Sequence, residues 1–289
     1  MASDNRFAVL IDADNVSVKY IKIILDEISK DGIATYKRIY GDWTNPSLIS
    51  WKSTLLDNSI IPVQQYSYTT GKNSTDSAMI IDAMDILYSG NVDGFCIVTS
   101  DSDFTKLVLR LRESGMTVIG MGERKTPNAF VSACETFKFL DILLNDENPS
   151  QNPSLPQTRK ESEADGSRKE AEKESDPNAV SNIPNMEEME KEIISIINTH
   201  ADDDGWVDLS ELGDNLPKRV PGFDPRNYKC TKLKQFIELF DSVEVRSARN
   251  PHNKILSIIY VRVKQKEEKP VLSKVRRGGK RKKDADAEE

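Results

Sequence analysis

The fold is constrained most by a regular alternation of strand-like and helix-like segments between residues 7 and 144. Short apolar runs indicate strands, and longer stretches with apolar residues every three or four positions indicate helices. A helix between successive strands is typical of parallel pairing, because parallel strands need a long crossover connection. The sequence therefore predicts an α/β fold with a doubly wound parallel sheet. The expected strands are 7–11, 34–40, 61–66, 94–99 and 117–121, and the expected helices are 16–30, 46–58, 76–89, 104–114 and 128–143.

The remainder of the chain divides by composition. Residues 146–185 are dominated by Pro, Ser, Asn, Glu and Lys and contain no aromatic residue. Such a segment buries too little apolar surface to offset its ordering entropy, so we predict a disordered linker. A first domain over residues 1–145 and a small second domain over residues 186–263 are expected on either side of it. Residues 264–289 are again polar and charged, which predicts a disordered basic tail.

The second domain is expected to be a winged-helix-like α+β unit. Its first helix is indicated by apolar residues on one helical face, namely Met189, Ile193, Ile196 and Ile197. A short helix should start at Leu209. Asp224 and Pro225 have the residue types preferred at the N-cap and first position of a helix, which we expect to continue to Phe240. Strands over 243–245 and 255–263 would then close the domain as a hairpin.

Composition excludes several classes of protein. The chain of 289 residues has a net charge of −7, yet residues 264–283 are strongly basic, so a nucleic-acid partner is not excluded. No apolar run approaches the roughly 20 residues that span a bilayer, and the first residues lack the pattern of a signal peptide, so a cytoplasmic protein without a membrane partner is expected. Three scattered cysteines suit a reducing compartment. Both histidines lie in the second half, which excludes a Ser-His-Asp triad in the first.

Acidic residues follow the expected strands of the first domain. Asp12 comes directly after the first strand, Asp101 and Asp103 follow the fourth, and Asp76 begins the third helix. In open α/β sheets the carboxyl ends of the strands form the ligand-binding edge. Carboxylates that converge there repel one another unless they are protonated or bridged by a cation. Hard oxygen ligands suit Mg²⁺ or Mn²⁺, so the pattern predicts a divalent-metal site.

Helix capping is the competing interpretation for each acid. Asp14 or Asn15 could cap the first helix in place of Asp12, and we expect Asp103 to cap the fourth helix and leave Asp101 free. Asp76 lies on the apolar face of its helix, where an unpaired charge is costly without a metal. On the same helix Asp82 and Asp85 are expected to be solvated surface charges. Asn15, the Ser100 hydroxyl and the loop residue Lys72 are candidates for positioning a substrate phosphate, although a loop lysine is commonly only solvated.

The acidic motifs resemble a known family. They are Ile11-Asp12-Ala13-Asp14-Asn15, Thr75-Asp76-Ser77-Ala78-Met79 and Ser100-Asp101-Ser102-Asp103-Phe104. In order and spacing they resemble the NYN domains of the PIN-like ribonuclease superfamily, specifically the LabA-like group, over about residues 7–144. The resemblance implies that Asp12, Asp76, Asp101 and Asp103 bind divalent metal and catalyse hydrolysis of RNA phosphodiesters. It also implies products with a 5′-phosphate and a 3′-hydroxyl.

The second domain resembles a different family. Gly205-Trp206-Val207, Leu209-Ser210-Glu211-Leu212-Gly213, Pro221-Gly222-Phe223-Asp224-Pro225-Arg226 and Tyr228 look like an OST-HTH or LOTUS domain. The resemblance implies binding of RNA, single-stranded or structured, with G-rich RNA as the leading class. The basic residues around the expected third helix suit a phosphate footprint, or are ordinary surface charge: Lys218, Arg219, Arg226, Lys229, Lys232 and Lys234.

Together these observations predict a metal-dependent ribonuclease in which the LOTUS domain recruits RNA to a flexibly tethered nuclease. Two alternatives stay open. A non-catalytic RNA-binding regulatory protein would keep the acids without activity. An aspartate-based phosphatase would use Asp12 as a covalent nucleophile within a DxD motif, which the acidic Asp76 disfavours. The sequence leaves open whether the chain forms a homo-oligomer.

Overall fold

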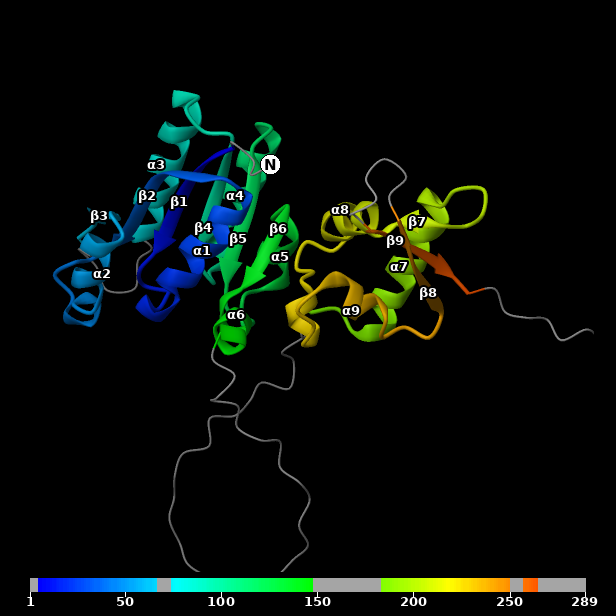
Figure 1. Cartoon of the computed structure of the whole chain (residues 1–289). Helices are drawn as coiled ribbons and strands as arrows, with labels where there is room; N and C mark the ends of the chain where they lie inside the picture. Colours follow the sequence, from blue (N-terminus) through cyan, green and yellow to red (C-terminus); the bar gives the residue numbers. More distant parts are fainter. Residues whose placement is uncertain (1–4, 67–73, 148–182, 250–256, 265–289) are drawn as a thin grey trace, which may run out of the picture.

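The computed structural model describes residues 5–66, 74–147, 183–249 and 257–264 (Figure 1). The first domain is built on a six-stranded parallel sheet with the strand order β3-β2-β1-β4-β5-β6. The predicted α/β class with a parallel sheet is confirmed. The strands are β1 (Arg6–Asp12), β2 (Ile33–Gly41), β3 (Ile61–Gln64), β4 (Gly94–Val98), β5 (Thr117–Gly122) and β6 (Thr136–Phe139).

Helices cover both faces of this sheet. On one face lie α1 (Ile21–Asp31), α2 (Trp51–Asp57) and α6 (Leu140–Glu147). The 3₁₀ turn η1 (Val18–Tyr20) precedes α1, and the 3₁₀ turn η2 (Pro46–Leu48) precedes α2. On the other lie α3 (Ser74–Ser89), α4 (Thr105–Glu113) and α5 (Asn128–Ala133). The 3₁₀ turn η3 (Ser102–Phe104) leads into α4.

Strand β1 has an almost continuously apolar sequence because both of its faces are buried. Phe7, Val9 and Ile11 contribute to the core on one face, whereas Ala8 and Leu10 contribute to the core on the other. All five are at most 1% exposed. A central parallel strand is buried on both sides and therefore lacks the polar alternation of a strand with one solvated face.

Strand β6 was not predicted, because residues 128–143 were expected to form one helix. In the structure α5 ends at Ala133, and Cys134 is already extended. The next residues alternate between half-buried Thr136 and Lys138 and buried Phe137 and Phe139. This period of two suits a strand, and β6 pairs in parallel with β5. The helical prediction is therefore wrong over residues 136–139, since a short alternating run was read as part of a longer helical pattern.

The second domain is a small helical unit closed by an antiparallel sheet, as expected for a winged-helix-like fold. Its elements are α7 (Met186–His200), β7 (Val207–Asp208), α8 (Leu209–Arg219), η5 (Pro225–Tyr228), α9 (Leu233–Ile237), β8 (Val243–Arg249) and β9 (Ser257–Val263). The strand order is β7-β9-β8. The single helix expected from Pro225 to Phe240 is wrong. Lys229 adopts a left-handed backbone with φ of 61°, which ends η5 before α9 begins.

The two domains are in direct contact. The sequence predicted only a flexible linker between them and no such contact. The Phe137 N–H on β6 donates a hydrogen bond to the Pro221 carbonyl at 2.6 Å. Arg226 binds Glu27 of α1, with its Nη1 at 2.7 Å from Oε1 and its Nη2 at 3.1 Å from Oε2. η5 also packs against α6. The second domain therefore docks beside the β6 edge of the sheet (Figure 1). The predicted linker and tail lie almost entirely outside the described residues.

Candidate functional site

The acidic residues meet where the strand order reverses. β1 pairs with β2 on one side and with β4 on the other, and the connections from these strands run in opposite directions across the sheet. At such a switch point the loops after the two strands separate and leave a crevice at the carboxyl edge. Asp12 is the last residue of β1, and Asp101 comes three residues after the end of β4. The sheet topology therefore brings them to one edge.

Asp12 is fully buried at this edge of the sheet. Its Oδ2 accepts hydrogen bonds from Asn15 Nδ2 at 2.7 Å and from Thr99 Oγ1 at 2.9 Å, and its Oδ1 accepts one from the backbone N–H of Asp14 at 3.0 Å. Burial raises the pKa of Asp12, although these three donors act in the opposite direction. The carboxylate is thus held rigidly by its donors and does not cap a helix.

The other three predicted ligands, Asp76, Asp101 and Asp103, form a compact cluster at this edge, and Asp12 is not part of that cluster. Asp76, in the first turn of α3, and Asp101 are half-buried, whereas Asp103 is exposed. Each offers a carboxylate oxygen within 4.8 Å of the oxygens offered by the other two. Oxygens at this separation can share one cation.

Asp101 is positioned by the turn that follows β4. Its side chain caps η3 by accepting a hydrogen bond from the Asp103 N–H at 2.9 Å, so the expectation that Asp103 caps and leaves Asp101 free is wrong. Its own N–H donates to Thr99 Oγ1 at 3.1 Å. Because the Thr99 hydroxyl also donates to Asp12, it links the ends of the two strands.

The electrostatics of the cluster favour a cation. Burial, followed by the charges of Asp12, Asp101, Asp103 and Asp14, raises the pKa of Asp76 to about 6. Mutual repulsion of this kind is relieved when a positive charge binds between the carboxylates. A set of carboxylate oxygens at an open crevice suits a hard divalent ion such as Mg²⁺ or Mn²⁺. The residues present therefore fit the metal that the sequence predicts.

Sequence reasoning missed the contact that fastens α3 to this edge. Asp14 Oδ2 accepts a hydrogen bond at 3.0 Å from the hydroxyl of buried Thr75, the residue before Asp76. The hydroxyl next to the acid in the Thr75-Asp76 pair was the available signal. This bond fixes the start of α3, and with it the Asp76 carboxylate, relative to the loop after β1.

The candidate positioning residues have different surroundings. Asn15 is exposed and donates to Asp12, so it can orient that carboxylate. The Ser100 hydroxyl accepts a hydrogen bond from the Glu123 N–H at 3.1 Å. Lys72 lies outside the described residues.

Asp82 and Asp85 differ in environment although they lie on one helix. Asp82 was expected to be solvated, and this is wrong: its side chain is 21% exposed and forms an ion pair with Arg38 of β2. It also accepts a hydrogen bond from the Tyr40 hydroxyl. Asp85 is exposed, as expected.

The predicted RNA-binding cations lie along the second domain. Lys218, Arg219, Lys229 and Lys232 are exposed, and Lys234 is partly exposed. Arg219 also donates to Ser195 Oγ at 2.8 Å and lies 3.7 Å from Glu192. Arg226 differs from the others because its guanidinium is engaged by Asp224 and by Glu27 of the first domain.

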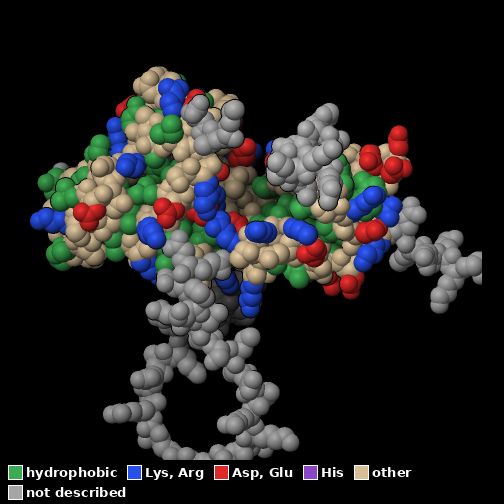
Figure 2. Space-filling view, viewed as in Figure 1, with side chains coloured by type: hydrophobic (Ala, Val, Ile, Leu, Met, Phe, Trp, Pro, Cys, Tyr) green, Lys and Arg blue, Asp and Glu red, His purple; other side chains and the backbone are tan. Residues whose placement is uncertain are grey.

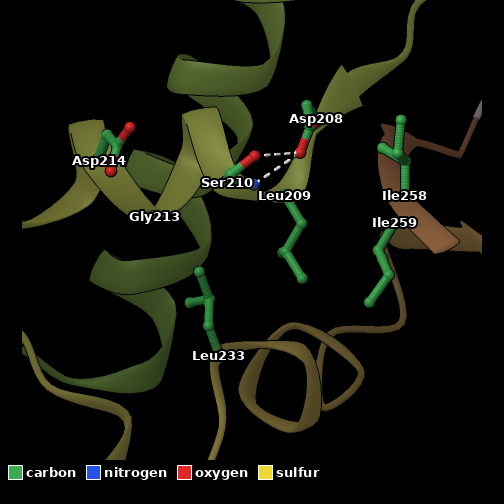
Figure 3. Close-up of a pocket in the computed structure, with 8 residues that line it drawn as sticks. All are labelled: Asp208, Leu209, Ser210, Gly213, Asp214, Leu233, Ile258 and Ile259. Atoms are coloured by element: carbon green, nitrogen blue, oxygen red, sulfur yellow. Dashed lines mark hydrogen bonds between the residues drawn. The ribbon is translucent and has the colours of Figure 1, made fainter. Parts of the chain in front are cut away.

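The second domain also contains a pocket of about 510 Å³ between α8, α9 and β9 (Figure 3). Asp208 caps α8 at its rim by accepting hydrogen bonds from the N–H and hydroxyl of Ser210. Leu209, Leu233 and Ile259 line it, and the described lining residues include no Lys or Arg. The pocket therefore lacks the cations expected of a phosphate site.

The strand order and the acidic crevice define the first domain as a PIN-like α/β domain. Two family models match the chain, one over each domain. The model of the NYN domain matches residues 6–143, and that of the OST-HTH/LOTUS domain matches residues 185–255. The chain therefore consists of an NYN domain, of the PIN-like nuclease superfamily, followed by an OST-HTH/LOTUS domain.

Individual relatives add little to this assignment. A protein of Methanocaldococcus jannaschii described as uncharacterized is 29% identical over 123 residues, which cover 41% of this chain and 48% of that protein. The chain thus spans about half the length of this relative. Among solved structures, a protein of unknown function from Vibrio parahaemolyticus matches with 20% identity and a TM-score of 0.40, over 47% of this chain and 94% of that one. MurG of Acinetobacter baumannii matches with 13% identity and a TM-score of 0.33, over 58% of this chain and 47% of that one. Likenesses this weak carry no argument.

Within the described ranges, no helix has both the length and the apolar character needed to cross a bilayer.

Proposed function

We propose that the protein is a ribonuclease that uses Mg²⁺ or Mn²⁺ to hydrolyse RNA phosphodiester bonds at the acidic crevice of its NYN domain. The observation that carries the proposal is the convergence of Asp76, Asp101 and Asp103 within 4.8 Å at the carboxyl edge of the sheet. A surface built only for solubility would gain nothing from placing three like charges together, because each raises the cost of ionising the others.

The chain's own residues have distinct roles in this proposal. Asp76, Asp101 and Asp103 would hold the cation, and Asp12 would add a fourth negative charge that acts on Asp76. When bound, the ion would supply Lewis-acid activation of water and of the phosphate. Thr99 and Asn15 keep Asp12 oriented, and Ser100 lies on the loop that a phosphate would approach. No histidine or covalent nucleophile is needed in such hydrolysis.

The LOTUS domain would recruit the RNA. We propose that Lys218, Arg219, Lys229, Lys232 and Lys234 contact phosphates, and that Arg226 would do so only after leaving Glu27. Contact between the domains, in addition to covalent tethering, raises the effective concentration of bound RNA near the crevice. Cleavage in the cytoplasm and a preference for G-rich RNA belong to the same proposal.

The test is cleavage of labelled single-stranded and structured RNAs by the full chain with Mn²⁺, with Mg²⁺ and with EDTA. Asp12→Asn and Asp101→Asn should each abolish cleavage and leave RNA affinity largely unchanged. Asp85→Asn, which removes an exposed acid on α3, is the matched control and should cleave at the wild-type rate. If either crevice variant degrades RNA as fast as the wild type, the proposal is wrong. Wild-type protein that binds RNA without cleaving it would favour the non-catalytic alternative.

A further inference from the structure

A second candidate site lies at the junction of the two domains, away from the acidic crevice. It is a cleft of about 610 Å³ with walls from both domains. Arg112 of α4 and Glu135 come from the NYN domain, and Lys218, Arg219 and Pro221 come from the LOTUS domain. In the space-filling view, Lys and Arg side chains lie on both domains near the line where they meet (Figure 2).

The contacts between the domains determine the shape of this cleft. Pro221, whose carbonyl accepts the hydrogen bond from Phe137, comes two residues after Arg219. The next residue, Gly222, packs so closely that a Cβ placed there would lie 3.3 Å from the ring of Phe139. The basic end of α8 is therefore held directly against the edge strand of the sheet. As a result, Lys218 and Arg219 are brought to face the same space as Arg112.

The charges of the cleft favour an anionic ligand. Three cations and one carboxylate line it, so its net charge is positive even with Glu135 ionised. Arg112 uses one Nη1 contact, to the Ala133 carbonyl at 2.8 Å, and a guanidinium has five N–H donors in all. Lys218 is exposed. Cations spread over two walls of an open cleft suit consecutive phosphates of a chain better than one compact anion.

Helix α4 connects the acidic cluster with the cleft. Helix α4 begins directly after η3, which carries Asp103, and Arg112 lies seven residues beyond its first residue, Thr105. At ~1.5 Å per residue this is ~10 Å along the helix axis.

We propose that this cleft binds the phosphodiester backbone of RNA, and that Arg112 of the NYN domain completes a phosphate-binding surface begun by Lys218 and Arg219. The proposal rests on the RNA-binding part of the proposed function and deepens it. It names a residue outside the LOTUS domain as a determinant of RNA affinity, and it makes that contribution depend on the docking of the two domains.

The experiment measures binding of a labelled single-stranded RNA of about 20 nucleotides to the full chain across a series of salt concentrations. All proteins carry Asp101→Asn and EDTA is present, so cleavage plays no part. Arg112→Gln should weaken binding ~3–10-fold and reduce the slope of log affinity against log salt by ~0.7, the value for one phosphate contact on a single strand. Arg112→Lys should retain the slope because it keeps the charge.

The matched control is Arg110→Gln, on the same helix. Arg110 is exposed and contacts Ser114 and Tyr88 rather than the cleft, so this variant should bind like the parent. Dependence on docking is tested with Glu27→Lys, which repels Arg226. In that background Arg112→Gln should have no further effect on affinity.

The inference is overturned if Arg112→Gln and Arg110→Gln give the same affinity and salt slope, or if the effect of Arg112→Gln persists undiminished in the Glu27→Lys background. Failure of the parent protein to bind any RNA would instead overturn the RNA-binding part of the proposed function. Failure of the wild type to cleave RNA would leave this binding result unchanged, so the outcomes are distinguishable.

Discussion

Glu27 provides a quantitative test of the contact between the domains. Its side chain is only 5% exposed and is surrounded by Lys30, Lys138 and Arg226. Burial alone would raise its pKa. Hydrogen bonds from Arg226 and Lys30, with the charges of Lys138 and Arg226, outweigh that effect and lower the pKa of Glu27 from 4.5 to about 2. This difference corresponds to about 3 kcal/mol in favour of the ionised form.

The sign of the pH dependence follows from a pKa that is lower in the folded protein than in the unfolded chain. The stabilisation is fully present above pH 4.5 and is lost as the pH falls toward 2. We expect Glu27→Gln to lower the free energy of unfolding by about 3 kcal/mol at pH 7 and by about 2 kcal/mol at pH 3.5. The loss shrinks in acid because the Glu27 carboxyl of the unfolded chain, with its ordinary pKa of 4.5, takes up a proton and favours unfolding, whereas the folded carboxylate stays ionised until the pH approaches 2.

The assay is urea unfolding of the full chain between pH 7 and pH 3.5, with Asp26→Asn as the control. Asp26 is exposed on the same helix, so its neutralisation should change stability by no more than about 0.5 kcal/mol. Hydrogen exchange at the Phe137 amide reports docking separately and should accelerate in Glu27→Gln. A loss that is equal at both pH values, or no larger than that of the control, would refute the reasoning.

The remaining predictions concern the crevice. Thr99→Val removes the hydroxyl shared by Asp12 and Asp101 and should weaken Mn²⁺ binding, measured by calorimetry, ~10–100-fold. The circular-dichroism spectrum should be unchanged, and an Mn²⁺ affinity equal to that of the wild type would contradict the linking role of Thr99. Gly122→Ala places a Cβ 2.6 Å from the Thr99 carbonyl and 2.7 Å from Thr126 Oγ1, and should cost about 1–3 kcal/mol in urea unfolding. Saturating Mn²⁺ should raise the melting temperature of the wild type and not of Asp101→Asn, since only a folded site binds the ion; an equal rise in both would place the ion elsewhere.

The sequence was sufficient to predict the fold class of the first domain and to predict that the acidic residues lie at one edge of its sheet. Both depend on a local pattern: apolar runs define parallel strands, and parallel strands end at the same edge. β6 was missed because the alternation of Phe137, Lys138 and Phe139 is short and follows a helical segment without a turn signal. Its strand character depends on the neighbouring β5, which supplies the pairing.

Contacts between distant residues could not be read from the sequence. Asp82 has the helical position of a surface charge, but its partners Arg38 and Tyr40 come from β2, more than 40 positions away. Glu27 and Arg226 are 199 positions apart. Nothing in the local pattern of either residue indicates the other. From the sequence, the basic segment around Arg226 therefore predicted only nucleic-acid binding. In the structure the Arg226 guanidinium also bridges the two domains.

The docked LOTUS domain has a consequence for how the NYN domain behaves alone. An exposed edge strand presents unpaired backbone groups that can pair with another chain. β3, at one edge, is only four residues long and contains Pro62, which cannot donate to a neighbouring strand. β6, at the other edge, has no proline, and its Phe137 N–H and Phe139 ring are covered by Pro221 and Gly222. A protein truncated after residue 147 should therefore self-associate through β6, whereas the intact chain protects that strand.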